Sequence, residues 1–127
     1  MARLASILIC DDEPSLRELM RLSLETGAGY SFVEAGDGSE AIETLESARP
    51  DLILLDVMMP GRSGLDVVAH IRTTPELAST PIVIISAFSS GADRIAALEL
   101  GATAFLAKPF DPDELSALVE ELLALKV

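Results

Sequence analysis

Short apolar runs recur along the chain, and each one is followed by turn residues and then by a helical pattern. A run of four or five apolar residues bounded by turns is typical of a buried strand, because a buried helix needs about 10–12 residues. We therefore predict strands at Ile7–Cys10, Phe32–Ala35, Leu52–Leu55, Ile82–Ile85 and Ala104–Ala107.

The segments between these runs carry apolar residues at helical spacing. The clearest case follows Asp111, Pro112 and Glu114, which form a predicted N-cap, first-turn proline and capping-box acid. We predict helices from Pro14 to before Gly27, after the turn Gly36-Asp37-Gly38 and up to Pro50, over Leu65–Arg72 and Ala92–Leu100, and after Pro112. Alternating strands and helices, with strands apolar on both faces, predict an α/β fold: a doubly wound five-stranded parallel sheet with helices on both faces.

Length and composition narrow the function classes. The 127 residues suit one domain spanning 1–127, and no apolar run approaches the ~18 residues that cross a bilayer. No secretory signal precedes the first strand, so we expect a cytoplasmic protein with no membrane partner. Cys10 is the only cysteine and is interpreted as a small buried strand residue. The net charge of −12 disfavours direct contact with nucleic acid.

Polar residues stand where the predicted strands end, which is where doubly wound sheets bind ligands. Asp11 and Asp12 follow the first strand, Asp56 the third, Ser86 the fourth and Lys108 the fifth. If the first and third strands are neighbours, about 4.8 Å apart, the acids form one cluster whose repulsion a hard cation such as Mg²⁺ would relieve. Each residue also has a structural interpretation, as a helix cap, a strand-end hydroxyl or a surface lysine.

These residues, with Pro60 and Gly64 after Asp56 and Pro109-Phe110 after Lys108, resemble the response-regulator receiver domains of two-component signalling, of the chemotaxis type. The resemblance covers essentially the whole chain. It implies a flavodoxin-like fold with strand order 2-1-3-4-5. It also implies that Asp56 accepts a phosphoryl group from a phosphohistidine on a sensor histidine kinase or a histidine phosphotransfer protein. The implied cofactor is Mg²⁺ or Mn²⁺, bound directly by Asp12, Asp56 and the Met58 backbone carbonyl, and by Asp11 through water.

The resemblance further implies a switch. Lys108 would hold one phosphoryl oxygen, Ser86 would take another on activation, and Phe105 occupies the aromatic position that then turns inward. A protein output partner would read the face formed by the fourth helix, the fifth strand and the fifth helix. Met58 and Phe88 are apolar where relatives control access of water, so we predict slow loss of phosphate. Thr103 and Ala104 replace acids of a charged dimer face, which makes that dimer and a transcriptional output doubtful.

Two other functions use the same architecture. A nucleotide-binding enzyme or an aspartate-dependent phosphatase is disfavoured, because the turn Asp11-Asp12-Glu13 is neither glycine-rich nor a DxD segment. A receiver-like fold that only binds partners is disfavoured by the intact acid, hydroxyl and lysine set. We therefore expect a domain that assists its own phosphorylation and dephosphorylation. We do not expect it to be an enzyme that turns over an external substrate.

Overall fold

The computed structural model describes residues 4–25, 29–59, 63–87 and 91–125. Its strands are β1 (Ser6–Cys10), β2 (Ser31–Ala35), β3 (Leu52–Leu55), β4 (Ile82–Ser86) and β5 (Ala104–Ala107). Its helices are α1 (Pro14–Leu24), α2 (Gly38–Ser47), α3 (Gly64–Arg72), the 3₁₀ turn η1 (Pro75–Leu77), α4 (Gly91–Leu100) and α5 (Pro112–Leu125).

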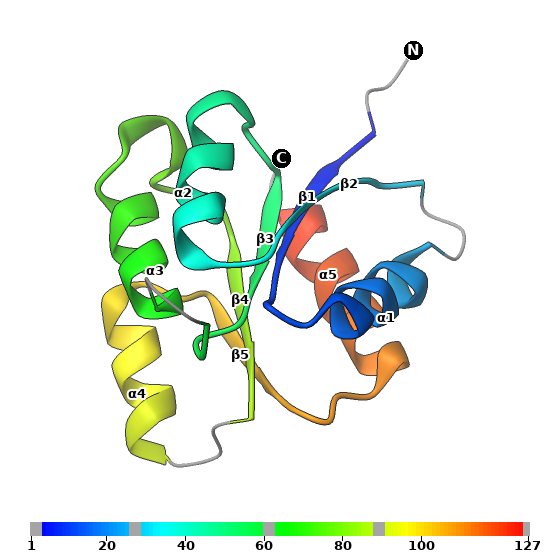
Figure 1. The fold of residues 1–127 in the computed structure, drawn as a ribbon. Helices are drawn as coiled ribbons and strands as arrows, with labels where there is room; N and C mark the ends of the chain where they lie inside the picture. Colours follow the sequence, from blue (N-terminus) through cyan, green and yellow to red (C-terminus); the bar gives the residue numbers. More distant parts are fainter. Residues whose placement is uncertain (1–3, 26–28, 60–62, 88–90, 126–127) are drawn as a thin grey trace.

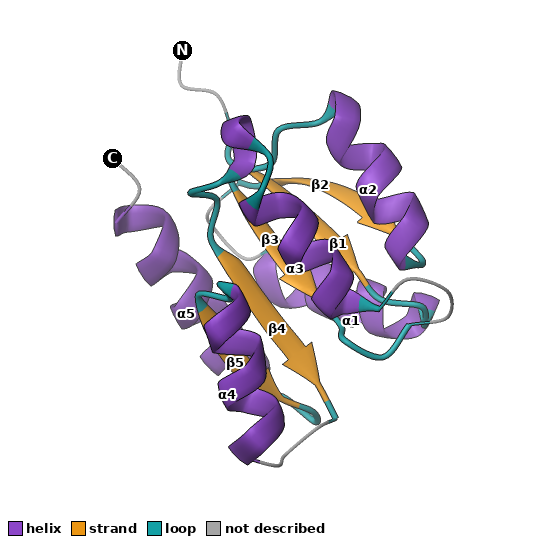
Figure 2. Cartoon of the chain, turned by 90° about the vertical axis from the view of Figure 1, so that its left-hand side faces the viewer, coloured by secondary structure: helices purple, strands orange, loops and turns teal. Residues whose placement is uncertain are grey.

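The strands form one parallel sheet in the order β2-β1-β3-β4-β5. Helices α1 and α5 cover one face, and α2, α3 and α4 cover the other (Figures 1 and 2). The predicted fold class, parallel sheet and strand order are therefore confirmed. All strands are parallel, so their carboxyl ends share one edge of the sheet. The strand order reverses between β1 and β3, where the following loops lead to helices on opposite faces (Figure 2).

Successive strand residues point to opposite faces and build two separate cores. Leu8, Ile53 and Ile84 belong to the core under α2, α3 and α4, whereas Ile9, Leu54 and Val83 belong to the core under α1 and α5. Both cores are fully apolar along the central strands, which is why those strands read as continuous apolar runs.

The element boundaries lie within a few residues of the prediction. Caps account for two helix starts: Asp37 accepts a hydrogen bond from the Glu40 amide (2.7 Å), and Asp111 accepts one from the Asp113 amide (2.9 Å). The 3₁₀ turn η1 was not predicted, since Thr74-Pro75 indicated only the end of the preceding helix. Within the described parts of the chain, no helix has the length and apolar character needed to cross a membrane.

Candidate functional site

The three predicted acids converge at the carboxyl ends of β1 and β3. Backbone pairing fixes the two loops side by side, because the Asp56 amide donates to the Cys10 carbonyl (2.9 Å). One ligand atom from each of Asp11, Asp12 and Asp56 lies within 4.8 Å of the others. Asp11 and Asp56 are buried, whereas Asp12 is exposed. The strand order therefore brings acids that are 45 residues apart in the chain into one site.

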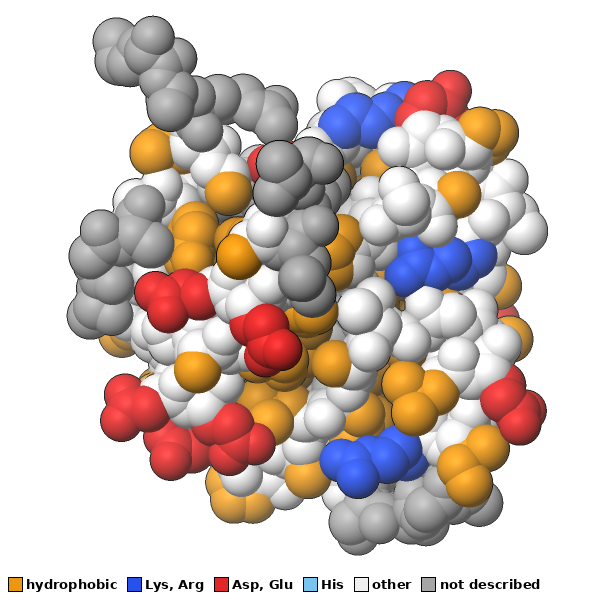
Figure 3. All heavy atoms as spheres, turned by 180° about the vertical axis from the view of Figure 1, so that it is seen from behind, with side chains coloured by type: hydrophobic (Ala, Val, Ile, Leu, Met, Phe, Trp, Pro, Cys, Tyr) orange, Lys and Arg blue, Asp and Glu red, His pale blue; other side chains and the backbone are white. Residues whose placement is uncertain are grey.

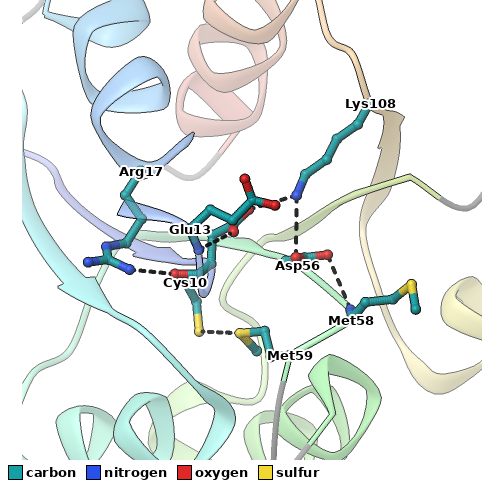
Figure 4. A network of polar contacts seen from close by, with 8 residues as sticks. Cys10, Glu13, Arg17, Asp56, Met58, Met59 and Lys108 are labelled. Atoms are coloured by element: carbon teal, nitrogen blue, oxygen red, sulfur yellow. Dashed lines mark hydrogen bonds and ion pairs between the residues drawn. The ribbon is translucent and has the colours of Figure 1, made fainter. Parts of the chain in front are cut away.

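Lys108 reaches this cluster from the end of β5 (Figure 4). Its Nζ lies 2.8 Å from Asp11 Oδ2 and 3.3 Å from Asp56 Oδ2. The Lys108 amide donates to the Ser86 carbonyl (2.8 Å), which anchors the backbone beside β4. Its side chain thus crosses the end of β4, which lies between β5 and β3, and its shorter contact of the two is with Asp11.

The electrostatics of Asp56 are set by opposing effects. Burial raises the pKa of the Asp56 carboxyl and the Asp11 charge adds to this, while Lys108 and the Met58 amide hydrogen bond (3.2 Å to Oδ1) oppose it; the net pKa is raised. Burial lowers the pKa of Lys108, but its hydrogen bond to Asp11 and the charges of Asp56 and Asp11 raise it overall. The ammonium is thus held charged beside the acids.

The cluster carries excess negative charge that suits a divalent cation. Three ionised carboxylates and one ammonium leave two formal negative charges in a space of a few ångströms. Oxygen ligands of one Mg²⁺ ion lie about 2.1 Å from it and so about 3–4 Å from one another. A spread of up to 4.8 Å is consistent with two carboxylates binding directly and a third through water. The donor set and its charge therefore fit Mg²⁺ or Mn²⁺.

Gly64 lets α3 begin against the backbone that carries Asp56. A Cβ placed on Gly64 would lie 2.3 Å from the Asp56 carbonyl oxygen and 2.7 Å from Val57 Cα. The Gly64 amide donates to the Val57 carbonyl (2.9 Å), and Ser63 caps the helix by accepting from the Asp66 amide (3.4 Å). Glycine at this position is required by the close approach, which fixes the residues after β3. Pro60, the other turn residue singled out in the sequence, lies outside the described residues.

Ser86 and Phe105 occupy neighbouring strands beside this cluster. Ser86 is fully buried at the end of β4, and the register that pairs Leu55 with Ile84 places it near the level of Asp56. Phe105 pairs with Ile84, is half-buried and packs against the core under α3 and α4. The Arg94 guanidinium of α4 lies 5.0 Å from the centre of the Phe105 ring, a cation–π contact.

The remaining sequence interpretations have mixed outcomes. Cys10 is fully buried, and burial, with the nearby acids, raises the pKa of its thiol to about 12, so it is an apolar core residue as predicted. Met58 is exposed beside Asp56, while Phe88 lies outside the described residues. Thr103 is exposed but also structural, since its hydroxyl accepts from the Ile82 amide (2.9 Å).

Sequence reasoning missed Arg17 on α1. Its Nη1 donates to the Asp11 carbonyl (2.7 Å; Figure 4). Its Nε lies 3.0 Å from Glu34 Oε1 on β2. In the sequence Arg17 is one of several charged residues on the polar side of a predicted helix. Its position six residues after Asp11, within the first turn of the helix that follows the acidic turn, was the available signal.

Comparison with known proteins places this site in a family. The model of the response regulator receiver domain family matches residues 7–120, nearly the entire chain. The chain belongs to this family. The resemblance predicted from the acidic turn, Asp56, Ser86 and Lys108 is thereby confirmed, and receiver domains of two-component response regulators are phosphorylation-dependent switches in general.

Curated relatives are longer than this chain. Response regulator Rre1 of Synechocystis sp. is 39% identical over 124 residues, which cover 98% of this chain and 54% of the relative. The alkaline phosphatase synthesis transcriptional regulatory protein PhoP of Bacillus subtilis is 39% identical over 117 residues, covering 92% and 48%. The chain thus spans about half the length of these relatives.

Solved structures of similar length have the same fold. The receiver domain of the Francisella response regulator 1452 has a TM-score of 0.89 and 29% identity, and the alignment covers 97% of this chain and 99% of that chain. The chemotaxis response regulator CheY4 of Vibrio cholerae has a TM-score of 0.87 and 32% identity, with 94% and 99% covered.

Proposed function

We propose that this chain is a phosphorylation switch in which Asp56 accepts a phosphoryl group from a phosphohistidine on a sensor histidine kinase or phosphotransfer protein. An Asp56 carboxylate oxygen forms a bond to phosphorus while the P–N bond of the donor breaks, and the departing imidazole nitrogen takes up a proton. The observation that supports this best is the Lys108 ammonium, which touches the nucleophile and the neighbouring Asp11 at once.

The residues around Asp56 divide the work of this transfer. Lys108 moves from its carboxylate partners to an oxygen of the incoming phosphoryl group, where it offsets the charge that the group brings. Asp12, Asp56 and the Met58 carbonyl would hold Mg²⁺ or Mn²⁺, with Asp11 acting through water. The bound cation supplies charge neutralisation at the phosphoryl oxygens. The Met58 amide and the Lys108 ammonium hold the carboxylate oxygens of Asp56 in place by donating hydrogen bonds to them.

Phosphorylation adds charge and acceptor oxygens next to β4, which provides the drive for a switch. We infer that the Ser86 hydroxyl moves to a phosphoryl oxygen and that Phe105 then turns further into the space this vacates. Phe105 has no hydroxyl to hold it at the surface, but Arg94 lies over its ring. The ring is half-buried, and the Arg94 contact opposes a further turn inward.

The output partner is proposed to bind the face formed by α4, β5 and α5. Figure 3 views this edge of the sheet and shows acidic side chains on the α5 side, basic ones on the α4 side, and hydrophobic surface between them. Ile95 and Leu98 on α4 are exposed large hydrophobic residues. Relatives named as DNA-binding or transcriptional regulators share this domain, so the predicted absence of direct nucleic-acid contact remains a prediction for the chain described here.

The deciding experiment uses phosphoramidate, a small donor whose P–N bond resembles that of phosphohistidine. The chain is incubated with it, with MgCl₂ or with EDTA, and intact mass is followed over time. We expect one phosphoryl adduct that forms only with the divalent ion and is absent from Asp56→Asn. An adduct of equal yield in the Asp56→Asn variant would place the acceptor elsewhere. Steady hydrolysis of a nucleotide would instead support the enzyme hypothesis.

A further inference from the structure

We infer that Arg17 is a positioning residue for the divalent-cation site, acting through the backbone of Asp11 and the loop that carries Asp12. This rests on the proposed function, since it concerns the same cation. Arg17 touches no carboxylate of the cluster. Its effect therefore has to be geometric, and that makes it separable by experiment from the effects of the ligands themselves.

The Asp12 carboxylate depends on its backbone for orientation. Among the described residues, no side chain or amide forms a hydrogen bond with it, and the residue is exposed. The adjacent residue is held differently: Asp11 accepts at Oδ1 from the Glu13 amide (2.9 Å) and at Oδ2 from Lys108 (2.8 Å). Arg17 adds the third constraint by donating to the Asp11 carbonyl (2.7 Å), which belongs to the peptide group shared with Asp12.

The guanidinium is itself held in place from the far side. Glu34 on β2 lies 3.0 Å from Arg17 Nε, and the Arg17 side chain is only 19% exposed. Because β2 pairs with β1 in register, with Ile9 opposite Glu34, this ion pair ties the loop after β1 to a strand of the sheet. The contacts that run from Glu34 through Arg17 to the Asp11 carbonyl form an outer shell of the kind that orients metal ligands.

Arg21 is a matched control on the same helix. It lies one turn further along α1 and approaches the same Glu34 (Nε to Oε2, 3.8 Å), but its other partner is Glu25 (3.2 Å). It carries the same charge as Arg17 without a hydrogen bond to the loop after β1. Arg72 is a second control, a partly buried arginine that bonds carbonyl groups at the opposite end of the sheet.

Charge and geometry predict opposite signs for Arg17. Removing a positive charge beside an acidic cluster should tighten cation binding, whereas releasing the Asp11–Asp12 peptide should weaken it. Loss of outer-shell partners typically weakens metal binding by about 10–100-fold. We therefore expect weaker binding in Arg17→Gln in spite of the lost charge, and weaker binding in Arg17→Lys, which keeps the charge but has no fork to bridge the carbonyl and Glu34.

The test is the Mg²⁺ dissociation constant of the whole chain, measured by isothermal titration calorimetry with MgCl₂. The expected result is a Kd raised about 10-fold in Arg17→Gln and several-fold in Arg17→Lys, with Arg21→Gln and Arg72→Gln within twofold of the unaltered chain. Thermal unfolding without Mg²⁺ checks that each variant is folded, and if Arg17→Gln is not, Arg17→Lys carries the comparison.

A Kd in the Arg17 variants that is unchanged or lower would overturn the inference. The same follows if Arg72→Gln weakens binding equally, because lost stability would then explain both. Failure of the unaltered chain to bind Mg²⁺ is a different result: it would remove the cation from the proposed function and this inference with it.

Discussion

Two long cationic side chains cross the two ends of the sheet, and they face different partners. At the carboxyl ends of the strands, Lys108 contacts the buried carboxylates of Asp11 and Asp56. At the amino ends, Arg72 donates to the neutral carbonyls of Gly101 (2.9 Å), Ala78 (3.1 Å) and Thr80 (2.7 Å). Burial lowers the pKa of the Arg72 guanidinium, while the pKa of the Lys108 ammonium is raised by its acids.

The difference separates the functional role expected of Lys108 from the structural role of Arg72. A carbonyl group that accepts a hydrogen bond from Arg72 takes part in no reaction. Loss of that hydrogen bond should therefore lower only the stability of the fold. Carboxylates held close together by Lys108 repel one another, so the site keeps excess negative charge that a cation and a phosphoryl group can use. The amino end should therefore respond to substitution in stability alone, and the carboxyl end in both stability and phosphorylation.

The largest effect is expected for Lys108→Met. Removing the ammonium leaves two buried carboxylates uncompensated, which should cost about 3 kcal/mol of unfolding free energy. Phosphorylation by phosphoramidate should slow by about 100-fold, since a charge donor at the phosphoryl oxygens is lost. Urea unfolding and intact-mass time courses at saturating MgCl₂ measure the two. A rate within threefold of the unaltered chain would show that Lys108 is only a structural counter-ion.

Arg72→Ala is expected to destabilise the protein by about 2–3 kcal/mol, because hydrogen bonds from a charged donor to three carbonyls disappear. The phosphorylation rate should not change at a temperature where the variant is folded. The same urea and mass measurements test this. A slowed transfer in a fully folded Arg72→Ala protein would mean that the two ends of the sheet are coupled, contrary to the comparison.

Much of this contrast was accessible from sequence, and the reasons are local. Apolar runs in the sheet interior and caps such as Asp111 fix where elements begin, so strand and helix positions followed from pattern alone. The acids, Ser86 and Lys108 were predictable because each stands at a strand exit, a position that the fold brings to one edge. What the pattern could not order was the sheet itself; the order came from family resemblance and is confirmed by the coordinates.

Arg17 and Arg72 were missed for a physical reason. Each is a charged residue on a helix, which ordinarily means a solvated face, and each gains its role from backbone carbonyls contributed by other segments. Carbonyl groups are present at every residue and leave no mark in a sequence. Hydrogen bonds from a side chain to the backbone of another segment are therefore the contacts of such a domain that are hardest to predict from a sequence pattern.

Two glycines sharpen the comparison with a smaller change. In Gly64→Ala the new Cβ would meet the Asp56 carbonyl oxygen at 2.3 Å; in Gly101→Ala it would meet Arg72 Cγ at 2.8 Å, at a φ of +116°. Overpacking or strain of this kind costs about 1–3 kcal/mol. We expect both variants to lose about 2 kcal/mol by urea unfolding. Only Gly64→Ala should also slow phosphorylation, and equal rates in the two variants would contradict the division between the ends.

The smallest effect concerns the pH dependence of Asp56→Asn. The folded-state pKa of Asp56 is raised by burial above the ordinary value of 3.8, so the ionised carboxylate destabilises the fold at neutral pH. Asparagine removes that cost while Lys108 keeps Asp11 as its partner at 2.8 Å. We expect Asp56→Asn to be more stable than the unaltered chain by about 1 kcal/mol at pH 7 without Mg²⁺.

The sign of the pH trend follows from the direction of that shift. As pH falls through the raised pKa towards 3.8, Asp56 takes up a proton in the folded state first, and the stability of the unaltered chain gains on that of the variant. The difference should therefore shrink at acid pH and persist at neutral pH, whereas Arg72→Gln should show a constant difference across the same range. A stability gap for Asp56→Asn that widens on acidification would mean that Lys108 stabilises the Asp56 carboxylate more than burial opposes it. Lys108 would then fully compensate the acids at the carboxyl end, as Arg72 satisfies the carbonyls at the amino end. No repulsion would remain for phosphoryl transfer to relieve.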